Sequence, residues 1–312
     1  MNRALVLGAS GGMGYAIVNE LSSRGVEVTA FARSEQKLNH LYGERPEITI
    51  QTGDIFNLHD VIAASENTDI IFQAANIPYP EWEDNLLPFI GNVLKAAETQ
   101  QTKLILIENI YAYGKSTGAK MTENTPKQPT TKKGKIRLQV EQMVKQSNVP
   151  AIIAHFPDFY GPNAENTLLH FTFKDAVQHK KAMYIGNQKI SREFIYTPDG
   201  AKAAVNLSLQ SNAYGHNYNI PGFGVITGEE IVQIIRELSE YDRPVRTVSK
   251  NMIRFLGLFN ANMREVVEMF YLNEEPVVLD GTKYETEIGP LPRTSYHEGI
   301  KQTLQYMTAQ SE

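Results

Sequence analysis

The 312-residue sequence predicts an α/β protein with a Rossmann-type, doubly wound parallel sheet and a smaller, mostly helical C-terminal lobe. Three observations lead to this prediction. Short apolar runs alternate with helix-like segments through the first half of the chain. The first of these runs stops at a cluster of glycines. Beyond Pro162 the alternation ends, and Pro-Gly and Gly-Pro pairs interrupt less regular segments.

Six strands are expected in the first half, because each is an apolar run that is too short for a helix. They cover residues 4–7, 26–31, 48–50, 69–72, 103–107 and 151–156. Apolar residues at helical spacing predict helices over residues 14–24, 86–98 and 136–144. Strands and helices in this order form a parallel sheet with right-handed crossovers.

The glycine cluster after the first strand has the spacing G-x-x-G-x-x-G, formed by Gly8, Gly11 and Gly14. Glycine permits a tight turn, lets the backbone approach a pyrophosphate, and lets the next helix pack on the strand. The phosphates then face free N–H groups at the start of a helix, where the helix dipole favours negative charge. Because the cluster lies between a predicted strand and a predicted helix, it predicts a dinucleotide-binding site.

The end of the second strand indicates which dinucleotide binds. A site for NAD(H) usually has an Asp or Glu there that holds the ribose hydroxyls. This sequence has Arg33 and Ser34 instead. The Arg33 guanidinium suits a phosphate, and the Ser34 hydroxyl can add a hydrogen bond. We therefore predict that NADP(H) is preferred over NAD(H). The alternative is that Arg33 is a solvated loop residue.

Other strand ends complete the predicted cofactor site. Asp54 follows the third strand and could accept a hydrogen bond from the adenine amino group. Ala74 and Ala75 follow the fourth strand and are small enough to admit the cofactor. All three could instead be turn and packing residues. The residues predicted to bind the cofactor are Gly8, Ser10, Gly11, Gly12, Met13, Gly14, Arg33, Ser34, Asp54, Ile55, Ala74, Ala75 and Pro157.

Two domains follow from this organisation. An NADP(H)-binding Rossmann domain is expected over residues 1–162 and a substrate-binding lobe over residues 163–312, with the chain partly crossing back to the sheet near residues 190–220. Within the lobe, residues 228–240 have the spacing of one amphipathic helix. Residues 252–271 are also helix-like. Their Met, Phe and Leu side chains are expected to pack in the core or, alternatively, to form a wall of the substrate site.

Composition narrows the possible functions. The net charge of -5 gives no electrostatic basis for a nucleic-acid or membrane partner. The chain has no cysteine, which excludes disulfides and thiolate sites. His155 and His170 lack metal-ligand spacing with carboxylates, so no metal is expected. The first apolar run is too short for a secretory signal or a membrane span. We therefore predict a cytoplasmic protein whose partner is a small-molecule substrate.

Together with short motifs further along the chain, these residues resemble the extended short-chain dehydrogenase/reductase superfamily, often labelled NAD-dependent epimerase/dehydratase. The added motifs lie at Tyr113 and Gly114 and over residues 158–162, 192–199 and 280–283. The resemblance covers nearly the whole chain. It implies an oxidoreductase, epimerase or dehydratase, and it implies a possible homodimer formed through two helices that flank the sheet.

Members of this family usually use three catalytic groups. A Ser or Thr polarises the substrate oxygen, a Tyr passes the proton, and a Lys four residues later holds the ribose and lowers the tyrosine pKa. Counted back from Tyr113, the Ser/Thr position falls on Asn109. The frame that fits best places Lys133 at the Tyr position and Arg137 at the Lys position. All three usual residues are therefore replaced, and the chain resembles an atypical member.

Each replacement retains part of the chemistry. Asn109 can donate a hydrogen bond to a carbonyl or oxyanion, and Arg137 keeps a cation beside the ribose. Lys133 could serve as the acid/base, as a lysine does in the isoflavone-reductase-like branch that residues 133–137 resemble. Alternatively, Lys133 is a solvated residue at a helix start. Tyr111, close to Asn109 in sequence, is a second candidate proton donor.

The resemblance also assigns Asp158 and Arg192 to the substrate site, because an arginine at the latter place contacts the substrate diphosphate in sugar-nucleotide epimerases. On this basis we predict an NADP(H)-dependent oxidoreductase that acts on a small carbonyl or hydroxyl substrate. One alternative is a sugar-nucleotide epimerase or dehydratase. Another is a catalytically silent NADP(H)-binding sensor or regulatory protein, in which loss of the usual triad is expected.

Overall fold

The structure, a computed structural model, describes residues 1–116 and 118–310. Its main sheet has seven strands, all paired in parallel, in the order β10-β6-β5-β4-β1-β2-β3. They are β1 (Arg3–Leu7), β2 (Glu27–Ala32), β3 (Ile48–Thr52), β4 (Ile70–Gln73), β5 (Lys103–Asn109), β6 (Ala151–Phe156) and β10 (Asn217–Asn219). The predicted Rossmann-type fold is therefore confirmed. All six predicted strands are present, and β10 is an additional one.

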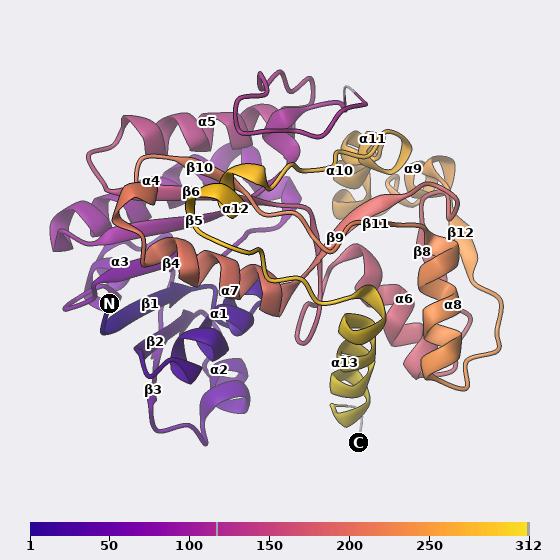
Figure 1. The fold of residues 1–312 in the computed structure, drawn as a ribbon, viewed down its shortest axis with the longest axis horizontal. Coiled ribbons are helices and arrows are strands. Elements are labelled where there is room, and N and C mark those ends of the chain that lie inside the picture. The colour runs from indigo at the N-terminus through magenta and orange to yellow at the C-terminus, as the bar shows by residue number, and fades with distance from the viewer. Residues whose placement is uncertain (117, 311–312) are drawn as a thin grey trace.

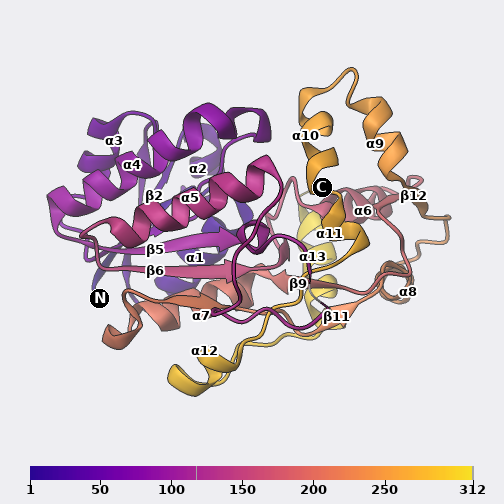
Figure 2. The same ribbon diagram turned by 90° about the horizontal axis from the view of Figure 1, so that it is seen from above.

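Helices cover both faces of this sheet (Figures 1 and 2). One face carries α1 (Gly12–Ser23), α2 (Glu35–Tyr42) and α7 (Thr197–Ser208). The opposite face carries α3 (Leu58–Ala64), α4 (Trp82–Gln100) and α5 (Lys132–Gln146). Both α7 and β10 follow residue 190 in the chain, so the chain leaves the sheet after β6 and returns to it later.

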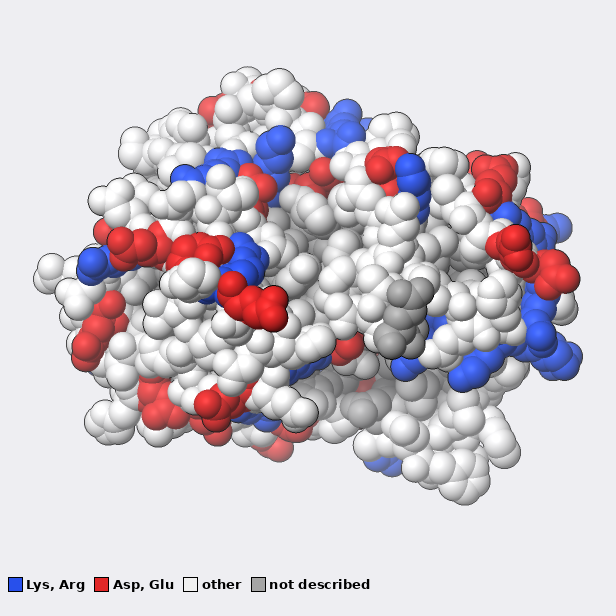
Figure 3. All heavy atoms as spheres, turned by 90° about the horizontal axis from the view of Figure 1, so that it is seen from below, with Lys and Arg blue, Asp and Glu red and all other residues white. Residues whose placement is uncertain are grey.

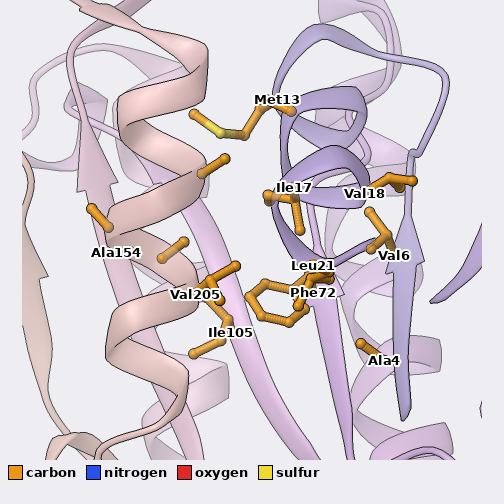
Figure 4. Packing of buried hydrophobic residues seen from close by; sticks show 14 of the residues in the cluster. Ala4, Val6, Met13, Ile17, Val18, Leu21, Phe72, Ile105, Ala154 and Val205 are labelled. Atoms are coloured by element: carbon orange, nitrogen blue, oxygen red, sulfur yellow. The ribbon is translucent and has the colours of Figure 1, made fainter. Parts of the chain in front are cut away.

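The core beneath α1 and α7 joins these two helices to the central strands of the sheet. Figure 4 shows Ile17 and Leu21 of α1 beside Val205 of α7 and the sheet residues Phe72 and Ile105. All five side chains are fully buried. Burial of one such side chain stabilises a fold by about 1.5–3 kcal/mol. The central strands are therefore anchored to α1 and α7.

Most of the second half of the chain forms the lobe to the right in Figure 1, whereas α7, β10 and α12 (Thr282–Glu287) lie in or beside the main sheet. Besides helices, the lobe contains two small sheets, ordered β11-β9-β7 and β12-β8. None of the helices in the described part of the chain is long and apolar enough to cross a bilayer. The elements of this half are β7 (Asp158–Tyr160), α6 (Leu168–Val177), β8 (Met183–Ile185), β9 (Arg192–Tyr196), β11 (Val225–Ile226), α8 (Gly228–Leu238), β12 (Arg246–Val248), α9 (Lys250–Leu256), α10 (Ala261–Met269), α11 (Tyr271–Glu274), α12 (Thr282–Glu287) and α13 (Tyr296–Ala309).

The segment 252–271 differs from its expected packing. It forms α9 and α10, and its inner residues Ile253, Met269 and Phe270 are buried as expected. Leu258 and Phe259, between the two helices, are largely exposed. The prediction of core packing was therefore wrong for the outer part of this segment, because the two helices form a hairpin whose tip extends away from the lobe.

Glu193 is an acidic residue inside β9, and its side chain is almost fully buried. Its carboxylate accepts a hydrogen bond from the Leu279 amide at 3.0 Å. Burial raises the pKa of Glu193 to about 7, and the Leu279 hydrogen bond opposes this rise only in part. The ionised form is therefore costly in the folded protein.

We predict that Glu193→Gln changes how stability depends on pH. Between the ordinary carboxyl pKa of 4.5 and about 7, the folded protein binds more protons than the unfolded chain, so its stability falls as pH rises. The amide does not titrate, so the variant should lack this fall, which is of the order of 2–3 kcal/mol. Urea unfolding of both proteins at about pH 5 and about pH 8 measures the difference. An equal fall in both would contradict the prediction.

Candidate active site

The glycine-rich turn joins β1 to α1 at the carboxyl edge of the sheet. Gly8 has a φ of +81°, and a Cβ on it would lie 2.5 Å from the Cα of Ala75, so glycine is required where the turn crosses the end of β4. A Cβ on Gly14 would lie 2.1 Å from the carbonyl oxygen of Gly8. Helix α1 therefore packs directly against the turn.

The start of α1 fits a bound pyrophosphate. Its N-cap residue, Gly11, makes no side-chain hydrogen bond to the helix, and the first turn has no acidic residue. The first N–H groups of a helix lack intrahelical partners, and the helix dipole favours an anion there. Gly12 and Met13 lie in this first turn, and Ser10 precedes it. A nicotinamide dinucleotide therefore fits this turn.

The loop after β7 covers the turn. Asn163 donates a hydrogen bond from Nδ2 to the carbonyl oxygen of Ser10 at 3.1 Å, and a Cβ on Gly12 would lie 2.5 Å from the Cα of Ala164. A cavity of about 460 Å³ adjoins this loop, between α2, α6 and α13. Of the described residues that line the cavity, none is a predicted proton donor. The cavity is therefore separate from the candidate site of proton transfer.

The end of β2 presents the residue that was predicted to select NADP(H). Arg33 is exposed, and its guanidinium makes no hydrogen bond or ion pair with any residue that the structure describes. Ser34 is the N-cap of α2, and its hydroxyl accepts a hydrogen bond from the Lys37 amide at 3.2 Å. Lys37 itself is paired with Glu165 at 2.6 Å. Arg33 is thus the cation that is available to a ligand here.

The loop after β3 contains Asp54 and Ile55. Asp54 is exposed, and its Oδ1 accepts a hydrogen bond from the Phe56 amide at 3.0 Å. Ile55 is buried. Asn92 of α4 fixes this loop by donating to the carbonyl oxygens of Ile55 and Phe56, at 3.1 and 3.0 Å. Among described residues Oδ2 of Asp54 has no hydrogen-bond partner, so it can accept from a ligand.

The ends of β4 and β6 supply the other predicted cofactor residues. Ala74 and Ala75 follow β4, and both are half-buried. Gln73 fixes Ala75, because its Nε2 donates to the Ala75 carbonyl at 2.8 Å and its Oε1 accepts from the Ala75 amide at 3.2 Å. Pro157 is buried between β6 and β7. Since β1, β4, β5 and β6 are neighbours in the sheet, these residues share one edge with the glycine turn.

Asn109 is the last residue of β5. Its Oδ1 accepts a hydrogen bond from the Tyr111 amide at 2.9 Å, which leaves its NH2 group as a donor for a substrate oxygen. The preceding residue, Glu108, is buried and forms an ion pair with Arg137 at 3.2 Å. Burial raises the pKa of Glu108, and the nearby Arg137 opposes this rise. The predicted residues Asn109 and Arg137 are therefore adjacent, linked by Glu108.

Arg137 is a fixed, buried cation. Its Cζ lies 4.0 Å from the centroid of the Trp82 ring, and its Nη2 donates to the Oδ1 of Asn76 at 2.9 Å. Trp82 is held in turn by a hydrogen bond from its Nε1 to the Ile77 carbonyl at 2.8 Å. Asn76 and Ile77 follow the end of β4, so Arg137 lies at the same edge as the glycine turn.

Tyr111 begins a short 3-10 helix after β5, and its hydroxyl lies 2.6 Å from the hydroxyl of Tyr79. Both rings pack against Trp82. Burial raises the pKa of Tyr111 well above its usual value, and the neighbouring Tyr79 adds to this rise. Burial also raises the pKa of Tyr79. Both phenols therefore remain protonated near neutral pH, and burial also makes each of them a weaker acid.

Lys133 lies in the first turn of α5, and its side chain is almost completely buried. Its ammonium pairs with Glu265 and, at 3.3 Å, with Glu268, both from α10. Its Nζ also lies 5.4 Å from the centroid of the Tyr79 ring. The amine therefore connects α10 to the edge of the candidate site. Its acid/base role stays a prediction.

Two variants distinguish a role of Lys133 in anchoring α10 from a role in acid/base catalysis. We predict that Lys133→Met lowers the free energy of unfolding by about 1–3 kcal/mol, because it removes charged hydrogen bonds to α10. Glu265→Gln together with Glu268→Gln should cause a similar loss in urea unfolding, because it removes the same charges from the other side. A Lys133→Met protein as stable as wild type would contradict the anchoring role. Turnover that fails in Lys133→Met but survives in the double variant would support acid/base catalysis.

The residues predicted to contact substrate, Asp158 and Arg192, lie on the neighbouring strands β7 and β9. Arg192 is buried, and its guanidinium contacts Asp158 through Nη2 and Asn273 through Nη1. Burial raises the pKa of Asp158, and Arg192 opposes this rise. The structure therefore brings both predicted residues together, with both terminal nitrogens of Arg192 bonded to protein side chains.

Several residues of this site were not identified from the sequence. Tyr79 had a usable signal, since it lies in an Ile-Pro-Tyr-Pro segment that soon follows β4, at the edge where ligands bind in such sheets. Glu108 and Trp82 had weaker signals. Glu108 is a carboxylate directly after the strand predicted over residues 103–107, and Trp82 is an indole shortly before the helix predicted over residues 86–98. Glu265, Glu268 and Asn273 had none, because they are far from the site along the chain.

A model of the NAD dependent epimerase/dehydratase family matches residues 4–221 of this chain. The chain is similar to UDP-N-acetyl-alpha-D-glucosaminuronate decarboxylase of Bacillus cytotoxicus, with 23% identity over 328 residues and 97% of each chain covered. It is also similar to 2-alkyl-3-oxoalkanoate reductase of Shewanella oneidensis, with 35% identity over 97 residues, which are 31% of this chain and 24% of that protein.

Solved structures share the fold over the whole chain. UDP-glucuronic acid 4-epimerase from Bacillus cereus, in complex with NAD, has a TM-score of 0.80 and 17% identity, with 99% of this chain and 100% of that chain covered. UDP-glucose 4-epimerase from Thermotoga maritima has a TM-score of 0.81 and 16% identity, with the same coverage. The family model itself spans more than half of the chain. The protein therefore belongs to the NAD-dependent epimerase/dehydratase family of enzymes.

Proposed function

We propose that this enzyme is an NADP(H)-dependent oxidoreductase that reduces a small carbonyl substrate. The observation that carries this proposal is Arg33, an exposed cation at the end of β2 with no partner among the described residues. A guanidinium there suits the 2′-phosphate of NADP(H), and the Ser34 hydroxyl lies next to it in the chain. When bound, the cofactor supplies the hydride.

The chain's own groups would position the substrate and supply the proton. The NH2 group of Asn109 is proposed to hold the carbonyl oxygen, and the Tyr111 hydroxyl to protonate it. The Tyr79 hydroxyl, 2.6 Å from that of Tyr111, is proposed to return a proton to Tyr111, and the half-buried Tyr79 would regain its proton from solvent. Arg137, fixed by Glu108, is proposed to lie beside the ribose. Phenols that stay protonated suit reduction, because oxidation of an alcohol needs a base.

A sugar-nucleotide epimerase or dehydratase is the second candidate. The similarity to the Bacillus cytotoxicus decarboxylase favours it, because it covers 97% of both chains. Two observations favour the reductase instead. The donors of Arg192, the predicted diphosphate contact, are bonded to Asp158 and Asn273. The match to an oxoalkanoate reductase has the higher identity, 35%, over 97 residues, which are 31% of this chain.

A substrate panel tests the proposal. The purified chain would be incubated with NADPH, or with NADH as the control, and with aldehydes, ketones, 3-oxo acids, UDP-sugars and dTDP-sugars. We expect NADPH oxidation with at least one carbonyl compound, accompanied by an equal amount of alcohol. Conversion of a sugar nucleotide without net NADPH consumption would support the second candidate. Tight NADPH binding without turnover of any compound would contradict both and favour a regulatory NADP(H)-binding protein.

A further inference from the structure

The tip of the α9–α10 hairpin carries the most exposed large apolar side chains in the described part of the chain. Phe255, Leu258 and Phe259 are 64%, 74% and 81% exposed. The hairpin projects beyond the rest of the molecule, as Figure 2 shows. Apolar side chains concentrated at a projecting tip mark an interaction surface, because isolated exposed apolar residues are spread more evenly on most proteins.

Basic residues lie in the hairpin and in the segment that leads into it. Residues 243–264 contain five Lys or Arg and no Asp or Glu, although the whole chain has a net charge of -5. Arg254 and Arg264 are exposed, and their side chains make no hydrogen bond or ion pair with any described residue. Gly257 brings them to the same end of the hairpin, since a Cβ on it would lie 2.9 Å from the Cα of Arg264 and 3.3 Å from the carbonyl oxygen of Arg254. In Figure 3 the lobe that projects at the lower right shows blue atoms and no red ones.

We propose that the α9–α10 tip binds the surface of an anionic lipid bilayer. The apolar side chains would enter the boundary between headgroups and acyl chains, while Arg254 and Arg264 would contact lipid phosphates. No membrane partner was predicted from the net charge of the whole chain. That charge does not describe residues 243–264, whose charged side chains are all basic. The same hairpin holds Glu265 and Glu268 against Lys133, so binding would keep the candidate site close to the bilayer.

A second copy of the chain is a poorer occupant of this surface. A stable protein interface buries roughly 800 Å² on each partner, which is more than a few side chains at a convex tip can offer. In a symmetric dimer formed through the tips, Arg254 and Arg264 of one copy would also face the same residues of the other. Like charges that meet in this way oppose association.

Sedimentation with vesicles tests this proposal on the full chain. The vesicles would be phosphatidylglycerol mixed with phosphatidylcholine, or phosphatidylcholine alone. We expect binding to the anionic vesicles that weakens as salt rises. Leu258→Ser with Phe259→Ser, and separately Arg254→Gln with Arg264→Gln, should each weaken binding by about tenfold or more. Phe223→Ser, which changes an exposed aromatic residue outside the hairpin, is the matched control and should bind as wild type does.

Three results would overturn the proposal. The first is that the wild-type chain does not bind anionic vesicles. The second is that both double variants bind them as strongly as wild type while their thermal unfolding midpoints are unchanged. The third is that light scattering shows self-association of the wild-type chain that Leu258→Ser with Phe259→Ser abolishes, without vesicle binding. The occupant of the tip would then be a second copy.

Discussion

Replacing Tyr111 with Phe should lower kcat by about 10²–10⁴-fold, the usual contribution of a general acid, and leave NADPH affinity nearly unchanged. The phenylalanine ring keeps the packing against Trp82 and removes only the hydroxyl that is proposed to protonate the substrate. Steady-state kinetics with the best carbonyl substrate, together with NADPH titration by fluorescence, measures the two quantities separately.

Tyr79→Phe is the matched control for this prediction. It removes a phenol that lies 2.6 Å from that of Tyr111, but it leaves the proposed donor in place. We expect a smaller loss of kcat than for Tyr111→Phe. Full activity of Tyr111→Phe would exclude Tyr111 as the donor. A larger loss in Tyr79→Phe would assign the proton transfer to Tyr79.

Replacing Arg33 with Asp should weaken NADPH binding by about 100-fold or more and change NADH binding far less. The variant loses charge-assisted hydrogen bonds to the 2′-phosphate, worth about 1.5–3 kcal/mol, and adds repulsion between two anions. NADH has no such phosphate, so it should bind the variant about as well as it binds wild type. Fluorescence titration with both nucleotides gives the two dissociation constants.

Lys37→Gln provides the control for Arg33→Asp. Lys37 is close to Arg33 in the chain, but its ammonium is already paired with Glu165. We therefore expect it to affect NADPH binding less than Arg33→Asp does. If Arg33→Asp weakened NADPH and NADH binding equally, Arg33 would not select the cofactor, and the preference for NADP(H) would be contradicted.

Much of the fold could be predicted because buried parallel strands appear in the sequence as short, continuous apolar runs. β10 could not, because Asn217 and Asn219 flank a single apolar residue over three positions. The outer part of the α9–α10 hairpin was misjudged for a related reason. Hydrophobic spacing indicates a helix face, but it does not show whether another element covers that face.

The candidate site, too, could be predicted from the sequence only in part. Residues at strand ends, such as Asn109 and Ala75, could be located because parallel strands end at one edge of the sheet. Their partners depend on tertiary contacts that no local pattern encodes. Glu265 reaches Lys133 across 132 positions of sequence, and Asn273 reaches Arg192 across 81. The sequence therefore indicated where Lys133 and Arg192 lie, but not that protein carboxylate and amide groups bind them.

Transfer of a deuterium label from the reduced nicotinamide tests the central claim most directly. NADPH that carries two deuterium atoms at C4 would be incubated with the enzyme and, one at a time, with the carbonyl compounds and sugar nucleotides of the substrate panel, and the products would be analysed by mass spectrometry. A reductase of the kind proposed should place the label on the carbon of the product alcohol, in an amount equal to the NADP+ formed. Label that stays on the nicotinamide, while a sugar nucleotide is converted or no compound changes, would contradict the proposal.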